Sequence, residues 1–163
     1  MSGEIEVRLA TAADAMGIAE AHMDSIATLG AVFYGPEIVQ DWGRPRGGER
    51  YVEAMARGET FFVAVERAPE ALVVGFASHR VSGGAHRTAV YVAGRAARRG
   101  VGTALFERAQ TVAAQQGADA IEVDASLAAV EFYRSLGFEV VSTGQHRIRS
   151  GAMMDCAFMR KLL

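Results

Sequence analysis

The turn Arg98-Arg99-Gly100-Val101-Gly102-Thr103-Ala104-Leu105 lies between two regular segments of the chain. The β-branched run 88–92 precedes it, and an amphipathic segment ending near Gly117 follows it. A strand, a glycine turn and a helix in this order can bind phosphate, because the free amides of the first helical turn point at the anion with the positive end of the helix dipole behind them. The stretch therefore predicts an anion-binding turn, to which the two arginines add positive charge.

Composition limits what the rest of the chain can be. The chain has 163 residues, is half apolar and has a formal net charge of -2, which predicts a single globular domain over residues 1–163 and argues against nucleic acid as a partner. The single cysteine, Cys156, allows no internal disulfide and favours a reducing compartment. Residues 1–7 do not resemble a signal peptide, and no apolar run approaches the ~20 residues of a membrane span. We therefore expect a cytoplasmic protein without a membrane partner.

Hydrophobic periodicity predicts a mixed α/β architecture. Strands are expected at 5–9, 61–66, 71–81, the run ending at 92, 120–125, 138–143 and 153–159, with a polar loop at 144–151. Helices are expected from 11 to 29, from 36, at 49–57, from 101 to the glycine at 117, and at 127–136. The early strands follow one another through turns, which predicts an antiparallel meander. The helix after the glycine turn is a crossover, so the strands on either side of it must be parallel.

Two motifs carry a resemblance to a known family. One is the run Val90-Tyr91-Val92 with the glycine turn, and the other is Ala129-Val130-Glu131-Phe132-Tyr133-Arg134-Ser135-Leu136-Gly137-Phe138. Together they resemble the strand-four, Q/R-x-x-G-x-G/A and A-x-x-F-Y-x-x-x-G-F motifs of the GCN5-related N-acetyltransferase (GNAT) superfamily, and the C-terminal portion is similar to a bacterial YafP-type subgroup. The resemblance implies the GNAT fold: a central twisted, mostly antiparallel sheet of about seven strands, with one splayed parallel pair and helices on both faces. The motif's Gln/Arg position is Ala97 here, and the arginines come one and two residues later.

By this resemblance the co-substrate is acetyl-CoA and no metal is needed. Its pyrophosphate would lie on the glycine turn and its pantetheine arm along the strand edge, where an amide near Val92 would stabilise the oxyanion. Tyr133 would donate to the leaving thiolate; periodicity alone favours a core aromatic residue at this position, and the match to the family motif reverses that preference. The implied cofactor-binding residues are Val90, Tyr91, Val92, Arg98, Arg99, Gly100, Val101, Gly102, Thr103, Ala104, Ala129, Phe132 and Tyr133.

The general base is left open by the sequence. Many family members have a glutamate on the strand before the turn, but the corresponding positions here are Arg87 and Ala89. His79 and His22 are the alternatives, and the amine could also lose its proton directly to solvent. A histidine on an apolar helix face, as His22 is, is more often structural than catalytic.

The acceptor pocket is expected to be lined by the first two helices and the link between them. Its candidate residues are His22, Ile26, Tyr34 and Trp42, with His79 opposite, a set that is aromatic and contains no acids. This composition favours a small amine, an amino-acid-like compound or a peptide N-terminus over a polycation. We therefore expect direct acetyl transfer to a primary amine. A homodimer is one assembly that this chain could form. The missing glutamate motivates the alternative of a non-catalytic CoA-binding sensor or interaction module. A mononucleotide-binding domain is disfavoured because no Lys-Ser/Thr follows the glycines.

Overall fold

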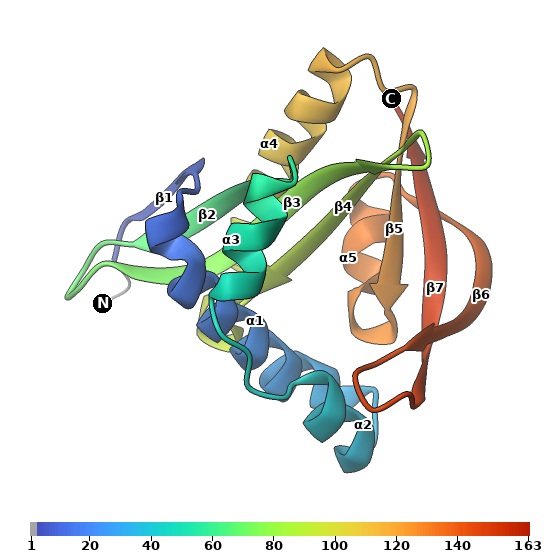
Figure 1. The fold of residues 1–163 in the computed structure, drawn as a ribbon, viewed down its shortest axis with the longest axis horizontal. Coiled ribbons are helices and arrows are strands. Elements are labelled where there is room, and N and C mark those ends of the chain that lie inside the picture. Colours follow the sequence, from blue (N-terminus) through green and yellow to red (C-terminus); the bar gives the residue numbers. More distant parts are fainter. Residues whose placement is uncertain (1–2) are drawn as a thin grey trace.

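A computed structural model describes residues 3–163 as a seven-stranded sheet in the order β1-β2-β3-β4-β5-β7-β6 (Figure 1). Met1 and Ser2, part of the N-terminal segment considered above, lie outside the described residues. All neighbouring strands are antiparallel except β4 and β5, which are parallel. The strands are β1 Ile5–Leu9, β2 Thr60–Glu66, β3 Leu72–Ser82, β4 Ala85–Val92, β5 Ala120–Ser126, β6 Glu139–Arg147 and β7 Met153–Leu162. The mixed, mostly antiparallel sheet that the sequence predicted is confirmed.

Helices cover both faces of this sheet. The α-helices are α1 Ala15–Leu29, α2 Pro36–Trp42, α3 Glu49–Ala56, α4 Val101–Gln115 and α5 Val130–Ser135. Short 3-10 turns occupy Ala12–Asp14, Gly30–Val32, Gly94–Ala96 and Leu127–Ala129. None of the helices in residues 3–163 is long and apolar enough to cross a membrane.

Two buried clusters hold the helices to the sheet. On one face, Leu105 and Phe106 of α4 pack with Phe62, Ile121 and residues around α5. On the other face, Ile18 of α1 and Tyr51 of α3 pack with Phe61, Val63 and Phe76. Alternate residues of the central strands thus belong to different clusters, as a pleated strand requires. We refer below to the α4 face and the α1/α3 face of the sheet.

The parallel strands β4 and β5 separate along their length. They pair only at His86↔Ile121 and Arg87↔Glu122, and Figure 1 shows them diverging beyond that point. On its other side β4 stays paired with β3, where the Ala93 amide donates to the Val74 carbonyl at 2.8 Å. Because amides alternate in direction along a strand, those of Val90 and Val92 point away from β3 and toward β5. The predicted splayed pair is confirmed, and it leaves backbone donors in the gap.

The segment between β6 and β7 is shorter than the loop predicted at 144–151. The strand ladder continues from Gly144↔Cys156 to Arg147↔Met153, so β6 extends to Arg147. Its polar residues misled the prediction because β6 is an edge strand, almost wholly exposed, whose side chains need not be apolar. The predicted first helix also begins differently, with a 3-10 turn that the Asp14 carboxylate caps by accepting from the Thr11 amide at 2.9 Å.

Candidate active site

The glycine turn leaves unpaired amides at the start of α4. Gly100 has φ 77°, a left-handed conformation that suits glycine, and its carbonyl accepts from the Ala104 amide at 3.1 Å. The amides of Val101, Gly102 and Thr103 precede that first helical hydrogen bond and have no helical partner. Of the five predicted positions from Gly100 to Ala104, Ala104 therefore has its amide occupied within the helix. The remaining amides, at the positive end of a fifteen-residue helix, suit an anion.

Gly102 joins the two sequence motifs in space. A Cβ atom at this position would lie 2.9 Å from two ring atoms of Phe132 on α5, so the absent side chain permits the close approach of α5 to the turn. Phe132 and Ala129 also pack against the buried cluster around α4. The structure therefore brings these predicted cofactor-binding residues to one place.

The two arginines of the turn have different surroundings. The guanidinium of Arg99 pairs with the Glu66 carboxylate of β2 at 2.9 Å, which directs it away from the turn. Arg98 is exposed, has the left-handed φ of 61°, and forms no ion pair with any residue in 3–163. Arg98 is thus the turn arginine that is available to an anion.

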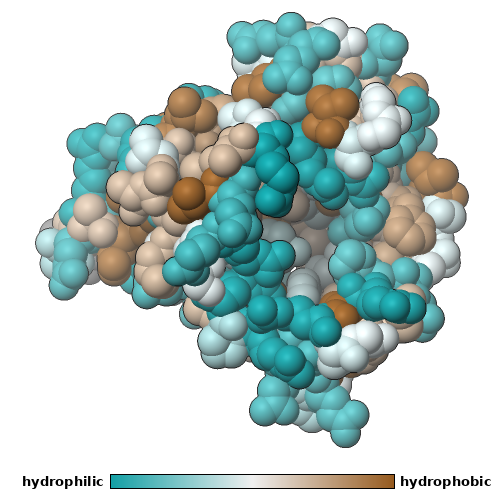
Figure 2. Space-filling view, in the orientation of Figure 1, coloured by the Kyte–Doolittle hydropathy of each residue, from teal (hydrophilic) through white to brown (hydrophobic). Residues whose placement is uncertain are grey.

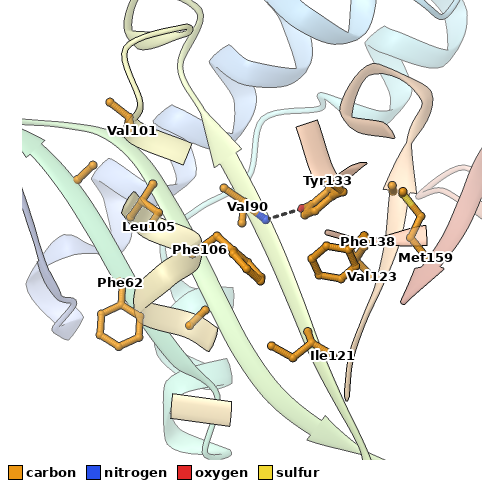
Figure 3. Close-up of a cluster of buried hydrophobic side chains, with 14 of the residues drawn as sticks. Phe62, Val90, Val101, Leu105, Phe106, Ile121, Val123, Tyr133, Phe138 and Met159 are labelled. Atoms are coloured by element: carbon orange, nitrogen blue, oxygen red, sulfur yellow. Dashed lines mark hydrogen bonds between the residues drawn. The ribbon is translucent and has the colours of Figure 1, made fainter. Parts of the chain in front are cut away.

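Tyr133 lies in the gap between β4 and β5. The Val90 amide donates to the Tyr133 hydroxyl oxygen at 3.0 Å (Figure 3), and the side chain of Tyr133 is only 2% exposed. Since the oxygen acts here as an acceptor, the phenol's own proton is free to be donated. Burial raises the pKa of Tyr133, with Tyr91 adding to the effect, so the phenol stays protonated throughout the physiological range.

His22 lines the α1/α3 face but is a poor base. Its Nδ1 lies 2.8 Å from the Tyr51 hydroxyl and 3.2 Å from a guanidinium nitrogen of Arg46. Because a guanidinium can only donate, Nδ1 must accept and the ring proton must be on Nε2, which is buried without a partner. Burial chiefly, then Arg46 and Arg50, hold the pKa of His22 well below its usual range. Its only lone pair is occupied, so it cannot readily accept a proton.

His79 belongs to the opposite face of the sheet. It alternates with Ser78 and Arg80 along β3, and the same-facing Ala77 packs in the α4-face cluster. Its Nε2 lies 2.9 Å from Nδ1 of His86, on which its ring is stacked. Burial, and secondarily the charge of His86, lower the pKa of His79. The side chains of His22 and His79 therefore lie on opposite faces of the sheet, although both residues line the cavity described below.

The depressed histidine pKa values predict a loss of stability in mild acid. The unfolded chain takes up protons below a histidine pKa of ~6.5, whereas folded His22 and His79 resist protonation, so the free energy of unfolding must fall as the pH falls below that value. We expect a lower urea midpoint at pH 5.5 than at pH 7.5. The decrease should be smaller in His22→Gln, and equal decreases in the variant and the parent protein would contradict the role given to His22.

A cavity of about 960 Å³ opens on the α1/α3 face, between α3 and the β5–β7–β6 part of the sheet. Figure 2 shows it as a central hollow with a largely hydrophilic rim. Three of the predicted acceptor residues, His22, Trp42 and His79, line it. We call this cavity the acceptor cavity.

Two predicted acceptor residues do not line this cavity. Ile26 is 1% exposed and fills the space beneath Gly43, so it belongs to the interior. The Tyr34 hydroxyl donates to the Asp155 carbonyl and accepts from the Leu127 amide, which ties the segment before α2 to β7. Tyr34 lines a smaller pocket beside α2 instead. Both differences arise from contacts between distant segments, which the helical periodicity cannot report.

Charged residues that the sequence did not single out line the acceptor cavity. Three are acidic and five are arginines, namely Glu53, Glu59, Asp124, Arg50, Arg57, Arg80, Arg87 and Arg149. Strand alternation could have assigned Glu59 and Arg87 to this face, because they share it with Phe61 and Tyr91. Burial raises the pKa of Glu59, against the opposing charge of Arg80 at 3.9 Å. The expectation of a cavity short of acids is therefore corrected to one with both charges and an excess of arginine.

Several solved acetyltransferase structures have a similar fold. A GCN5-related N-acetyltransferase from Rhodopseudomonas palustris superimposes with a TM-score of 0.84 at 27% identity, covering 100% of this chain and 98% of that one. A ribosomal-protein-alanine N-acetyltransferase from Brucella melitensis gives 0.71 at 26% identity, covering 97% and 99%. A putative acetyltransferase from Salmonella typhimurium, solved with acetyl-CoA, gives 0.72 at 22% identity, covering 98% and 94%.

No curated protein sequence matches the chain, but a protein-family model does and agrees with the structural comparison. The family model described as an acetyltransferase (GNAT) domain matches residues 34–155, which include the glycine turn, both parallel strands and Tyr133. The chain belongs to the GNAT family of acetyltransferases.

Proposed function

We propose that the protein transfers the acetyl group of acetyl-CoA directly to a primary amine. The observation that carries this proposal is the hydrogen bond from the Val90 amide to the buried Tyr133 hydroxyl, inside the gap between β4 and β5. It puts a protonated phenol and backbone donors where a thioester could enter between two strands.

The binding mode follows from the free donors. The pyrophosphate of acetyl-CoA would accept hydrogen bonds from the amides of Val101, Gly102 and Thr103, with Arg98 beside it. The pantetheine arm would then lie along the β4 edge, where the Val92 amide points into the gap and the Val90 amide already donates to Tyr133. Two proteins of similar fold support acetyl-CoA as the ligand, since the Salmonella protein was solved with acetyl-CoA and the PaiA N-acetyltransferase of Thermoplasma acidophilum with coenzyme A.

The chemistry can be assigned to few groups. The amine nitrogen attacks the thioester carbonyl carbon, and the Val92 amide stabilises the oxyanion that forms. When the tetrahedral intermediate collapses, the carbon–sulfur bond breaks and the electron pair leaves with sulfur. Tyr133 donates a hydrogen bond to this thiolate. Because the pKa of Tyr133 is raised above its usual value while a thiol ionises near ~8.5, stabilisation rather than complete proton transfer is the expected role.

The proton lost by the amine is proposed to pass to water in the acceptor cavity. No carboxylate stands on β4, the lone pair of His22 is occupied, and Nε2 of His79 is hydrogen-bonded to Nδ1 of His86. Glu59 is two strands from β4 and level with Arg87. Strand geometry therefore places Glu59 ~14 Å from Val90, which is too far for direct proton transfer.

Release of free thiol from acetyl-CoA across a panel of amines tests the proposal. We expect thiol release only when an accepted amine is present, with kcat/KM rising with pH toward the amine's own pKa and showing no histidine inflection near ~6.5. Release with no amine, although acetyl-CoA binds, would favour the alternative of a CoA-binding module.

The two turn arginines make a matched pair for testing the phosphate site. Arg98→Ala is expected to weaken acetyl-CoA binding about tenfold, since a charge-assisted hydrogen bond to phosphate is lost. Arg99→Ala removes the pair with Glu66 and should leave the affinity nearly unchanged. Isothermal titration of both variants decides between them, and the reverse order of effects would show that the assignment is wrong.

A further inference from the structure

We propose that the amine accepted by this protein also carries a carboxylate, as an amino acid does, and that three arginines bind it, two of which line the acceptor cavity and one of which lies beside it. Arg50 and Arg149 line the cavity together with Tyr51, and the guanidinium carbon of Arg50 lies 5.8 Å from the Tyr51 ring centroid. Arg46 lies beside them, 3.2 Å from Nδ1 of His22, and we call the three arginines the arginine cluster. This inference rests on the proposed function, because it names the substrate class of the same site.

The arginine cluster lacks an acidic partner. None of its three guanidiniums lies within 4.0 Å of a carboxylate of residues 3–163, whereas Arg80 and Arg87 of the same cavity pair with Glu59 and with Asp124. Arg46 donates instead to the Trp42 carbonyl at 2.6 Å, and Arg149 to the carbonyls of Arg44 and Pro45 at 3.3 Å. The nearby Asp41 is already bonded to Ser150 and paired with Arg44.

The same cluster holds buried donors that no protein atom satisfies. Nε of Arg46 and Nε2 of His22 are both buried without a hydrogen-bond partner, and the tautomer of His22 makes its Nε2 a donor. Leaving such groups unpaired is costly, and so is bringing like charges together around a half-buried guanidinium. A carboxylate would accept several hydrogen bonds at once and offset the positive charge.

The location of the cluster fits a bifunctional acceptor. The His22 ring lies on Tyr91, with centroids 4.1 Å apart, and Tyr91 stands between the two β4 residues whose amides enter the gap. A ligand held by the arginine cluster is thus separated from the thioester site by one strand of the sheet. An amino acid has an amine and a carboxylate on one small skeleton, and its carboxylate can be held on this face while the amine turns toward the gap.

Matched acceptors test the inference. L-amino acids and their carboxamides are compared by thiol release, with rates expressed per unprotonated amine because the carboxylate raises the pKa of the neighbouring amine. We expect kcat/KM to favour the acids by at least about tenfold, as the loss of charged hydrogen bonds implies. Equal or better use of the carboxamides, or of peptides with blocked carboxyl groups, would overturn the inference.

Substitution of Arg50 localises the effect. Arg50 is exposed on α3, so Arg50→Gln should fold normally, raise the KM for the acids about tenfold and leave the values for acetyl-CoA and the carboxamides unchanged. Arg50→Glu should shift the preference toward the carboxamides. Arg160→Gln, an exposed arginine outside the cavity, is the control and should change nothing. Equal losses on acids and carboxamides in Arg50→Gln would contradict carboxylate binding.

Titration calorimetry separates the two proposals. Amino acids are titrated into the protein saturated with CoA, which cannot donate an acetyl group. If no amine releases thiol but an acid binds and Arg50→Gln weakens it, the proposed transferase function fails while the anion site stands. If thiol is released from amines without a preference for the acids, the function stands and the anion site fails.

Discussion

Gly102→Asp should lower the affinity for acetyl-CoA by at least ~100-fold, the loss expected for a carboxylate about 5 Å from a pyrophosphate near a protein surface. The substitution puts a negative charge among the amides that we assign to the phosphates. It also forces the side chain against the Phe132 ring, which a Cβ atom would approach to 2.9 Å. Titration calorimetry of the purified variant with acetyl-CoA measures the effect.

The steric and electrostatic parts of this effect can be separated. Gly102→Ala shares the collision with Phe132 but adds no charge, so its affinity should fall much less. Thr103 is exposed in the same helical turn. Thr103→Glu should stabilise the free protein, since an acid at a helix N-terminus is favourable, and yet weaken binding, whereas Thr103→Gln should do neither. If Thr103→Glu and Gly102→Asp both bound acetyl-CoA normally, the glycine turn would not be the phosphate site.

Tyr133→Phe should reduce turnover at least ~100-fold, the usual contribution of a positioned proton or hydrogen-bond donor. The affinity for acetyl-CoA should change little, because the phosphate and pantetheine contacts come from the backbone. Steady-state kinetics and titration calorimetry give the two quantities. The free protein should also lose about 1–3 kcal/mol in free energy of unfolding, since the buried Val90 amide loses its acceptor.

A packing control is needed because Tyr133 is part of the core. Its ring lies 5.3 Å from that of Phe138, and Phe138→Leu disturbs the same packing without removing the hydroxyl. That variant should lose stability and keep most of its turnover. If Tyr133→Phe retained full turnover, or Phe138→Leu lost as much, the hydroxyl would not act on the leaving group.

Local patterns were enough to predict the framework of the site. The glycine turn, the helix after it and the crossover that makes β4 and β5 parallel depend on neighbouring residues and on chain connectivity. The motif around Tyr133 is likewise local, and its contact with Gly102 follows once α4 and α5 lie on the same face of the sheet.

The acceptor side depends on long-range contacts, which no local pattern contains. Arg98 and Arg99 differ only because Glu66 of a distant strand holds one of them. The arginine cluster gathers residues from the α2–α3 loop, from α3 and from the β6–β7 turn, and Tyr34 is held by Leu127 and by Asp155 of β7. A homodimer, a cytoplasmic location and the YafP-type likeness stay predictions.

A crystal structure of the complex with acetyl-CoA tests the central claim most directly. We predict the pyrophosphate on the amides of 101–103, the thioester carbonyl toward the Val92 amide, and the sulfur ~3–4 Å from the Tyr133 hydroxyl, within hydrogen-bonding reach. A cofactor bound outside the gap between β4 and β5, or one whose sulfur is remote from Tyr133, would contradict the account.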